Sequence, residues 1–360
     1  MRKRKRFSIF FLVSLSLCLI TWIMLLISRR SYKVGDFLND TVCHYFRFVM
    51  AKFGDIFPFS LYEVLLFSIP LILVIVIVLL VRRIKYGGLS RMLFNIAAIV
   101  FIILTGKNLA LAIAYNTTTV DKKMDMEVVE VTQSRLAEVM LSLRDEINSL
   151  VPKIEYLEDG SSAPDYDFRE LGEKLCESYD ALNEEYGFPK SFKTRPKSFE
   201  CGPLMSYFGT LGIYTFFTGE ANVNSEYPMY DRAFTAAHER AHQRGILREN
   251  EANFVAYLVT STSDDVYLRY SGALSMYEYI ANALYSENKE LYREIDSGLS
   301  DKARADRVAS YKVYEKYSDN LLNKISNFIN DLYLKSNGTE GSVTYSRVVI
   351  LTVAYYESMK

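Results

Sequence analysis

Three long apolar runs in the first third of the chain constrain its fold more than any other feature. They cover residues 7–28, 60–81 and about 92–115 of 360. The first contains 22 uncharged positions. At about 1.5 Å per residue in a helix, that length is enough to cross a hydrocarbon core about 30 Å thick. We therefore expect a membrane domain at residues 1–115 with three transmembrane helices, and the lipid bilayer as a partner.

The overall composition agrees with this division of the chain. Hydrophobic residues make up 50% of the sequence, yet the mean hydropathy is only +0.03, so the apolar residues must be concentrated in a few places. The remaining residues, 116–360, have the mixed composition of a globular domain. The charges nearly balance, with 42 Lys and Arg against 43 Asp and Glu. Nucleic acid is therefore not an expected partner, because phosphate binding calls for a basic surplus.

Basic clusters predict the orientation of these helices. A cleaved signal peptide is the alternative for the first run, but the run is longer than a typical signal-peptide core and no small-residue cleavage site follows it. The positive-inside rule assigns residues 1–6, "MRKRKR", and the basic loop at residues 82–91 to the cytoplasm. Three crossings then make residues 116–360 extracytoplasmic. The loop at residues 29–58 weakens this bias, since it also holds five basic residues beside three aspartates.

The second part of the chain reads as mostly helical. Apolar residues recur at three- and four-residue spacing over 132–151 and 167–188, and a helix is expected from Pro228 to a cap at Gly245. Another helix is expected from about Arg248 or Glu249, and most of the remainder is also helical. The best candidate strand lies within "GIYTFFTGEANVN", residues 212–224, followed on its C-terminal side by the predicted helix. These patterns predict an α+β domain, mainly α, with a small sheet.

Two of the three histidines in the chain form a His-Glu-x-x-His pattern. His238 and His242 are four residues apart, so both imidazoles lie on one face of a helix, as a zinc site requires. Glu239 occupies the position where metalloproteases carry the general base that takes a proton from water. The alternative is two surface histidines in a chance match. Their rarity in the chain and the surrounding alanines favour a metal site for one Zn²⁺.

A carboxylate is the expected third ligand. Arg248 stands where one metalloprotease class has a third histidine, and the following "ENEAN" offers Glu249 and Glu251. The spacing from Glu249 to Asn253 is similar to the second motif of the gluzincins, in which the glutamate binds the metal and the residue four positions later steadies the first histidine. This similarity favours Glu249 as the ligand and Asn253 as its supporting partner. Glu251 remains the alternative ligand.

The candidate strand has two interpretations. It could hold an extended peptide substrate by pairing with it, with Tyr214, Phe216, Glu220 and Asn222 beside the site. Alternatively it is an ordinary buried strand, and its polar residues serve in turns or as caps.

Two of the four cysteines, Cys176 and Cys201, lie in the second part of the chain. They could pair in an extracytoplasmic setting or remain thiols, and the sequence does not decide between these states.

The whole chain resembles a known family of bacterial integral membrane proteins, domain of unknown function 3810 (DUF3810). The resemblance rests on the segment containing the histidines and on three others, namely "PFSLYEVLLF", "FTGEANVN" and "YLKSNGTEGSVTYSRVV". It implies a multi-pass protein of the bacterial cell membrane and a suspected metallopeptidase of the gluzincin kind. It implies no substrate.

Together these observations predict a mainly α membrane protein with a zincin-like metallopeptidase domain. The expected activity is zinc-dependent hydrolysis of peptide bonds in exported or cell-envelope proteins. The first alternative is a membrane-anchored zinc-binding sensor or binding protein without activity, although an intact Glu239 argues against a purely structural site. A transporter is a weaker alternative, because the apolar runs hold only Glu63 and Lys107 as ionisable groups.

Overall fold

The computed structural model describes residues 8–188, 192–341 and 347–360. The basic residues 1–6 and part of the C-terminal family motif lie outside the described residues. The chain separates into two compact units. The first comprises Met1–Thr117 together with Thr215–Glu220, and the second comprises Thr118–Tyr214 and Ala221–Lys360.

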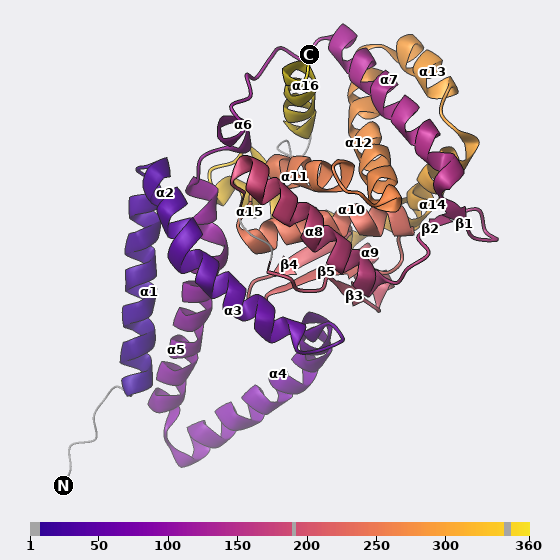
Figure 1. The fold of residues 1–360 in the computed structure, drawn as a ribbon. Coiled ribbons are helices and arrows are strands. Elements are labelled where there is room, and N and C mark those ends of the chain that lie inside the picture. The colour runs from indigo at the N-terminus through magenta and orange to yellow at the C-terminus, as the bar shows by residue number, and fades with distance from the viewer. Residues whose placement is uncertain (1–7, 189–191, 342–346) are drawn as a thin grey trace. The chain divides into compact units, whose positions relative to one another are not determined.

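The first unit contains the three expected long apolar helices (Figure 1). They are α1 (Ile9–Ser28), α4 (Leu61–Tyr86) and α5 (Leu89–Lys107), and α5 continues through a π turn, Asn108–Ala112, to a short 3₁₀ turn. Each is long and apolar enough to cross a membrane. The short loop Gly87–Gly88, in which both glycines have positive φ, links α4 to α5.

Residues 29–58, expected to form a loop, are instead mostly helical. They form α2 (Tyr32–Leu38), a π turn (Asn39–Cys43) and α3 (His44–Asp55). A Cβ atom at Gly35 would lie 2.0 Å from the Asn116 carbonyl oxygen, so only glycine lets α2 approach the end of the third apolar segment this closely. The loop was predicted because the segment holds several charged residues, but most of these residues lie on helices that pack within the first unit.

A six-residue segment far along the sequence, Thr215–Glu220, completes the first unit. The Glu220 carboxylate accepts hydrogen bonds from the backbone N–H groups of Leu61 (2.9 Å) and Tyr62 (3.0 Å), the first two residues of α4. These N–H groups have no partner inside the helix, so a carboxylate there both satisfies them and complements the helix dipole. Gly219, with φ 71°, would place a Cβ atom 2.2 Å from the Met50 carbonyl carbon.

The second unit is helical with two small sheets (Figure 1). Its helices are α6 (Val120–Lys123), α7 (Gln133–Leu150), α8 (Phe168–Tyr186), α9 (Gly202–Tyr207), α10 (Met229–Arg244), α11 (Glu249–Ser261), α12 (Val266–Glu287), α13 (Lys289–Ser297), α14 (Asp301–Ser318), α15 (Leu321–Ser336) and α16 (Val348–Ser358). Its strands are β1 (Glu155–Tyr156), β2 (Ser162–Ala163), β3 (Lys197–Phe199), β4 (Gly212–Thr215) and β5 (Glu220–Asn224).

The core of the second unit lies around α12. This helix packs against α7, α10, α11 and α13, and α11 also contacts α8 and α16. Tyr270, Leu274, Tyr277 and other side chains of α12 are fully buried there. Burial of this kind is favourable by roughly 1.5–3 kcal/mol for each large apolar side chain. Helices of this core therefore carry apolar residues at helical spacing, the pattern from which the sequence predicted helices.

The expected strand is two strands rather than one. β4 and β5 flank the turn Phe216–Gly219, and β5 is the middle strand of the order β3-β5-β4. β3 pairs with β5 in parallel, with Lys197 opposite Asn222. Phe216 and Phe217 look like strand residues by composition, but they belong to the turn, because that segment packs in the first unit.

The cysteines form no disulfide in the parts of the chain that the structure describes. The buried Cys176 instead accepts a hydrogen bond from Arg240 on α10, at 2.6 Å between Nη2 and Sγ.

Candidate metal centre

A sharp reversal of the chain brings the end of α10 against the start of α11. Gly245 ends α10 in the left-handed region at φ 95°, where an ordinary side chain is disfavoured. The Ile246 N–H donates to the Ala241 carbonyl at 3.0 Å and closes the helix end. The next helix then begins at Glu249, and the two helices pack together.

His238, His242 and Glu249 meet as a result of this reversal. The Glu249 Oε2 atom lies 3.3 Å from His238 Nε2 and 3.5 Å from His242 Nε2. Among the described residues, these three form the one group of His, Cys, Asp or Glu whose ligand atoms all lie within 4.8 Å of one another. Their side chains are 12%, 10% and 11% exposed, so the group is nearly enclosed but still open to solvent.

The spacing within this group fits a zinc ion. A tetrahedron with metal–ligand bonds of about 2.1 Å has edges of about 3.4 Å, close to the two measured nitrogen–oxygen separations. Two imidazoles and one carboxylate also form a donor set that zinc uses in catalytic sites. The residues present therefore fit the ion that the sequence pattern predicts.

One ring of the group is held in a defined orientation. The His242 Nδ1 atom lies 2.8 Å from the Ile246 carbonyl oxygen, which assigns the ring proton to Nδ1 and leaves Nε2 as the electron-pair donor. His238 Nδ1 is buried and has no hydrogen-bond partner in the described chain, and the same holds for Asn253 Nδ2. The structure therefore does not form the expected hydrogen bond between Asn253 and His238, although both side chains are largely enclosed.

Glu251 points away from this group. Its carboxylate pairs with Arg248 Nη1 at 3.0 and 3.1 Å and accepts a hydrogen bond from the Val120 N–H at 3.4 Å. Residues two apart on a helix differ by about 200° around its axis, so Glu249 and Glu251 necessarily face opposite sides. Of the two glutamates that the sequence offers, the geometry favours Glu249 as a ligand.

Glu239 lies beside the group, held by the first strand of the hairpin. It is buried, and the backbone N–H of Tyr214 on β4 donates to its carboxylate. Burial, assisted by the nearby charge of Glu249, raises its pKa above the ordinary value despite the two histidines. Gly212 leaves room for it, since a Cβ atom there would lie 2.7 Å from Glu239 Oε1.

The two partners in the group affect each other's protonation. Burial lowers the pKa of His242, but the charge and hydrogen bond of Glu249 outweigh it and raise that pKa to about 9. Burial opposes ionisation of Glu249 as well, yet the charge of His242 and the bonds from both histidines hold its pKa well below the usual range. Without a metal, this arrangement is a buried imidazolium–carboxylate pair.

The residues expected along a substrate strand are dispersed. Tyr214 lies on β4, at the edge of the sheet and beside Glu239. Phe216 lies in the turn, and Glu220 caps α4 as described. Asn222 is fully buried on the central strand and donates to the Ile213 carbonyl at 3.4 Å, so it braces β4. Of these residues, only Tyr214 lies beside the candidate site as expected. Glu220 and Asn222 instead have structural roles, as a helix cap and as a residue of a buried strand.

A cavity of about 670 Å³ is lined by residues that neighbour the group rather than by the group itself. Its wall includes Leu211, which precedes β4, and Thr235, one helical turn before Glu239. It also includes Tyr279, which is close enough for the charge of Glu249 to contribute, after burial, to raising its pKa. Asp231 lies in the same wall, two helical turns before His238.

Gly212 and Asp231 are site residues that the sequence analysis missed. The seven-residue spacing from Asp231 to His238 was a usable signal, because residues seven apart share one helix face. No comparable signal identifies Gly212, whose close approach to α10 exists only in the folded chain.

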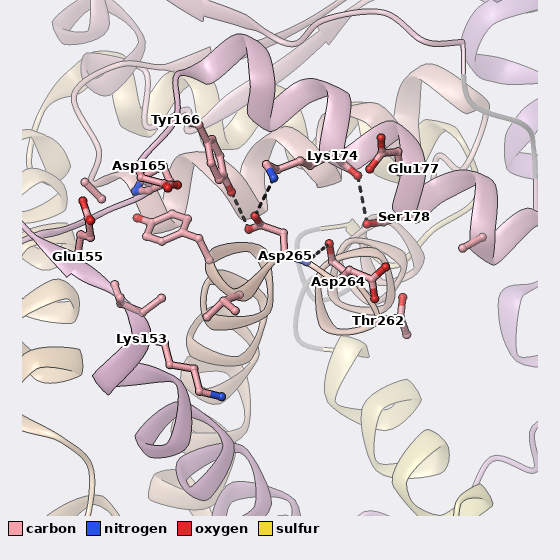
Figure 2. Close-up of a pocket in the computed structure, with 17 residues that line it drawn as sticks. Lys153, Glu155, Asp165, Tyr166, Lys174, Glu177, Ser178, Thr262, Asp264 and Asp265 are labelled. Atoms are coloured by element: carbon pink, nitrogen blue, oxygen red, sulfur yellow. Dashed lines mark hydrogen bonds and ion pairs between the residues drawn. The ribbon is translucent and has the colours of Figure 1, made fainter.

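A second cavity of about 560 Å³ lies elsewhere in the second unit (Figure 2). Tyr166 and Lys174 both point at Asp265 in its wall, with Tyr166 Oη 2.6 Å from Oδ1 and Lys174 Nζ 3.2 Å from Oδ2. Asp265 Oδ1 also accepts from the Leu268 N–H at 2.9 Å and so caps α12. The central carboxylate of this cavity is therefore fully partnered by its own chain.

The fold and the site define a class before any relative is considered: a mainly helical, membrane-associated protein with a His-His-Glu cluster in a second helical unit. A family described as "Protein of unknown function (DUF3810)" matches residues 37–353, and the chain belongs to this family. No curated protein and no solved structure matches the chain.

Proposed function

We propose that the protein is a membrane-anchored zinc-dependent peptidase. The single observation that carries the proposal is the convergence of His238 and His242 on Glu249, at two nitrogen–oxygen distances close to a tetrahedral edge, beside a buried Glu239. A structural zinc site is normally closed by four protein ligands. In the described chain the group has three members, which is the ligand number of a catalytic site with one open position.

Zinc bound by these three residues would supply Lewis-acid chemistry, polarising a peptide carbonyl and acidifying water. Glu239 accepts a proton from the attacking water while the water oxygen adds to the carbonyl carbon. The carbon–nitrogen bond then breaks, and Glu239 returns the proton to the leaving nitrogen. The Tyr214 N–H keeps the carboxylate in place for both transfers.

The edge strand supports a polypeptide substrate. β4 has β5 on one side only, and its start lies against Glu239. An extended peptide could add to the other side of β4 through backbone hydrogen bonds, which would bring a peptide bond near the group. With residues 118 onward outside the cytoplasm, as the basic clusters predict, the substrates would be exported or cell-envelope proteins.

The test uses the full-length protein purified in detergent. Zinc content is measured by metal analysis, and cleavage of casein and of a mixed peptide library is measured by mass spectrometry. Wild type is compared with Glu239→Gln and with Glu158→Gln, in which an exposed glutamate between β1 and β2 serves as the matched control. We expect one zinc ion per chain in all three proteins and cleavage in wild type and the control alone.

The outcomes separate the candidate functions. Zinc retained with activity lost in Glu239→Gln supports the peptidase. Wild-type protein that binds no zinc would overturn every zinc-dependent function. Zinc binding without cleavage of any peptide would overturn the peptidase and leave the zinc-binding sensor as the better account.

A further inference from the structure

The cavity near the metal centre contains an acid with a buried oxygen that has no hydrogen-bond partner among the described residues. Ser310 and Tyr230 both donate hydrogen bonds to the carboxyl group of Asp231 on α10, but its Oδ2 atom is buried and has no hydrogen-bond partner among the described residues. A buried carboxylate oxygen without a donor is costly, and such groups are uncommon in folded proteins. An oxygen of this kind in a cavity wall indicates a donor that arrives from outside.

The cavity of Figure 2 shows how the same protein satisfies a similar acid. There Lys174 reaches Asp265 at 3.2 Å, and Tyr166 donates to the other oxygen. No ion pair to Asp231 occurs in the described chain. Arg307, an arginine of the same wall, is already engaged by Asp296 at 2.9 Å and Glu278 at 3.5 Å.

The rest of the wall also favours a cation. Three acidic residues, Asp231, Glu278 and Asp296, line the cavity with two arginines, so acidic residues outnumber basic ones in the wall. Aromatic rings attract cations through their faces. Five aromatic residues lie in the wall: Tyr227, Phe234, Tyr279, Tyr311 and Tyr314. The volume of about 670 Å³ is ample for a long side chain.

The location of the cavity connects it to the chemistry. Its wall includes Leu211 at the start of the edge strand and Thr235, whose Cγ2 atom lies against Gly212 beside Glu239. A side chain that enters from a peptide paired with β4 would therefore reach Asp231 along one face of α10.

The geometry points to a specificity pocket for a basic residue: the cavity takes the lysine or arginine side chain of a polypeptide substrate, with its cationic group at Asp231. The role of this pocket in substrate choice rests on the proposed peptidase function. Binding of a cationic side chain at Asp231 does not depend on that function. Burial, and then the charges of Glu278 and Asp306, raise the pKa of Asp231 to about 8. A bound cation would favour the ionised carboxylate and so lower this pKa.

A binding experiment tests the pocket without requiring any cleavage. N-acetyl-arginine amide is titrated into full-length protein in detergent and followed by calorimetry, with N-acetyl-citrulline amide as the uncharged isostere. The proteins are wild type, Asp231→Asn, and Asp264→Asn, an exposed acid in the wall of the other cavity. Thermal unfolding of each variant verifies that it is folded.

We expect wild type and Asp264→Asn to bind the arginine probe about 10- to 100-fold more tightly than citrulline, the size expected for hydrogen bonds to a charged group. Asp231→Asn should lose this preference. Equal binding of the two probes by wild type, or a preference that survives in folded Asp231→Asn, would overturn the inference.

Cleavage then separates this inference from the proposed function. Peptides that differ only by arginine or citrulline at one position are offered to wild type. Preferred cleavage next to arginine supports both proposals. Cleavage of both peptides at equal rates would overturn the pocket and leave the peptidase intact. Binding of the arginine probe through Asp231 with no cleavage of any peptide would overturn the peptidase and leave a cation-binding pocket.

Discussion

Gly212 lies against Glu239 so closely that a Cβ atom would be 2.7 Å from both Cγ and Oε1 of the glutamate. The same Cβ atom would lie 2.5 Å from Thr235 Cγ2. The first residue of β4 thus sets the location of the carboxylate that the proposed reaction uses. A side chain at position 212 must displace either the strand or Glu239.

Replacing Gly212 with alanine should therefore lower peptidase activity more than stability. Overpacking of this kind costs about 1–3 kcal/mol. A misplacement of about 1 Å at a reacting group can lower the rate about 100-fold. Activity and thermal unfolding of full-length protein measure the two effects. Gly298→Ala is the control, since the three atoms nearest to a Cβ atom there all belong to the flexible side chain of Arg144. Unchanged activity in Gly212→Ala would show that the contact does not position the base.

Removal of the two neighbouring glutamates should have different consequences. Loss of a residue that supports a metal ligand lowers metal affinity roughly 10- to 100-fold. Glu249→Ala should weaken zinc binding by more than this, because it removes a direct ligand. Glu251→Ala should retain zinc but destabilise the fold, since it leaves Arg248 without its buried carboxylate. Competition with a zinc chelator and thermal unfolding measure these outcomes. Equal zinc loss in both variants would contradict the assignment of Glu249.

Glu220 should stabilise the first unit through the start of α4. Glu220→Ala leaves the Leu61 and Tyr62 N–H groups without their acceptor, at a cost of about 1–2 kcal/mol, the upper part of the range for a lost helix cap. Glu220→Gln keeps one side-chain oxygen, so its stability should lie between those of the alanine variant and wild type. Thermal unfolding of full-length protein gives the comparison, with Glu158→Ala as an exposed control. Identical unfolding temperatures of Glu220→Ala and wild type would show that the Glu220 cap does not stabilise the protein.

Asp231 should make stability depend on pH. Its pKa is raised from 3.8 to about 8 by burial and then by Glu278 on α12 and Asp306 on α14, while Ser310 and Tyr230 donate to it and oppose the rise. Below about pH 4 both the folded and unfolded chains keep it protonated. As the pH rises from about 4 to 8 only the unfolded chain ionises, so stability falls, by up to about 1.4 kcal/mol per unit.

The corresponding measurement compares unfolding temperatures across this range. Asp231→Asn cannot ionise, so its stability should fall less than that of wild type between pH 4 and 8, and the two curves should run parallel above about pH 8. Curves that stay parallel from pH 4 onward would show that Asp231 does not carry a raised pKa in the folded chain.

Local patterns predicted much of this structure because they are governed by local geometry. The apolar runs predicted α1, α4 and α5, and helical spacing predicted α7, α8, α10 and α11 to within a few residues. The approach of Glu249 to the two histidines follows from three short-range features: the four-residue histidine spacing, the turn at Gly245 and the next helix start.

The remaining features depend on contacts between distant segments. The sequence favoured Glu249 over Glu251 only through a similarity to a known motif, because the positions of the two carboxylates depend on the helical phase of α11 relative to α10. The use of Glu220 as a cap for a helix some 160 residues earlier has no local signal. The unpartnered oxygen of Asp231 likewise appears only when α10, α12 and α14 enclose a cavity.

The segment Thr215–Glu220, which belongs to the first unit, determines how the protein can be dissected. The chain crosses between its two units at three points rather than one, so no single cut separates them. A soluble fragment that begins at Thr118 would still carry Phe216 and Phe217, but without Gly106 and Tyr62, against which they pack. It would also release the strand that holds Glu239 in place. Loss of activity in such a truncated protein would therefore report a damaged edge strand rather than the absence of a catalytic site.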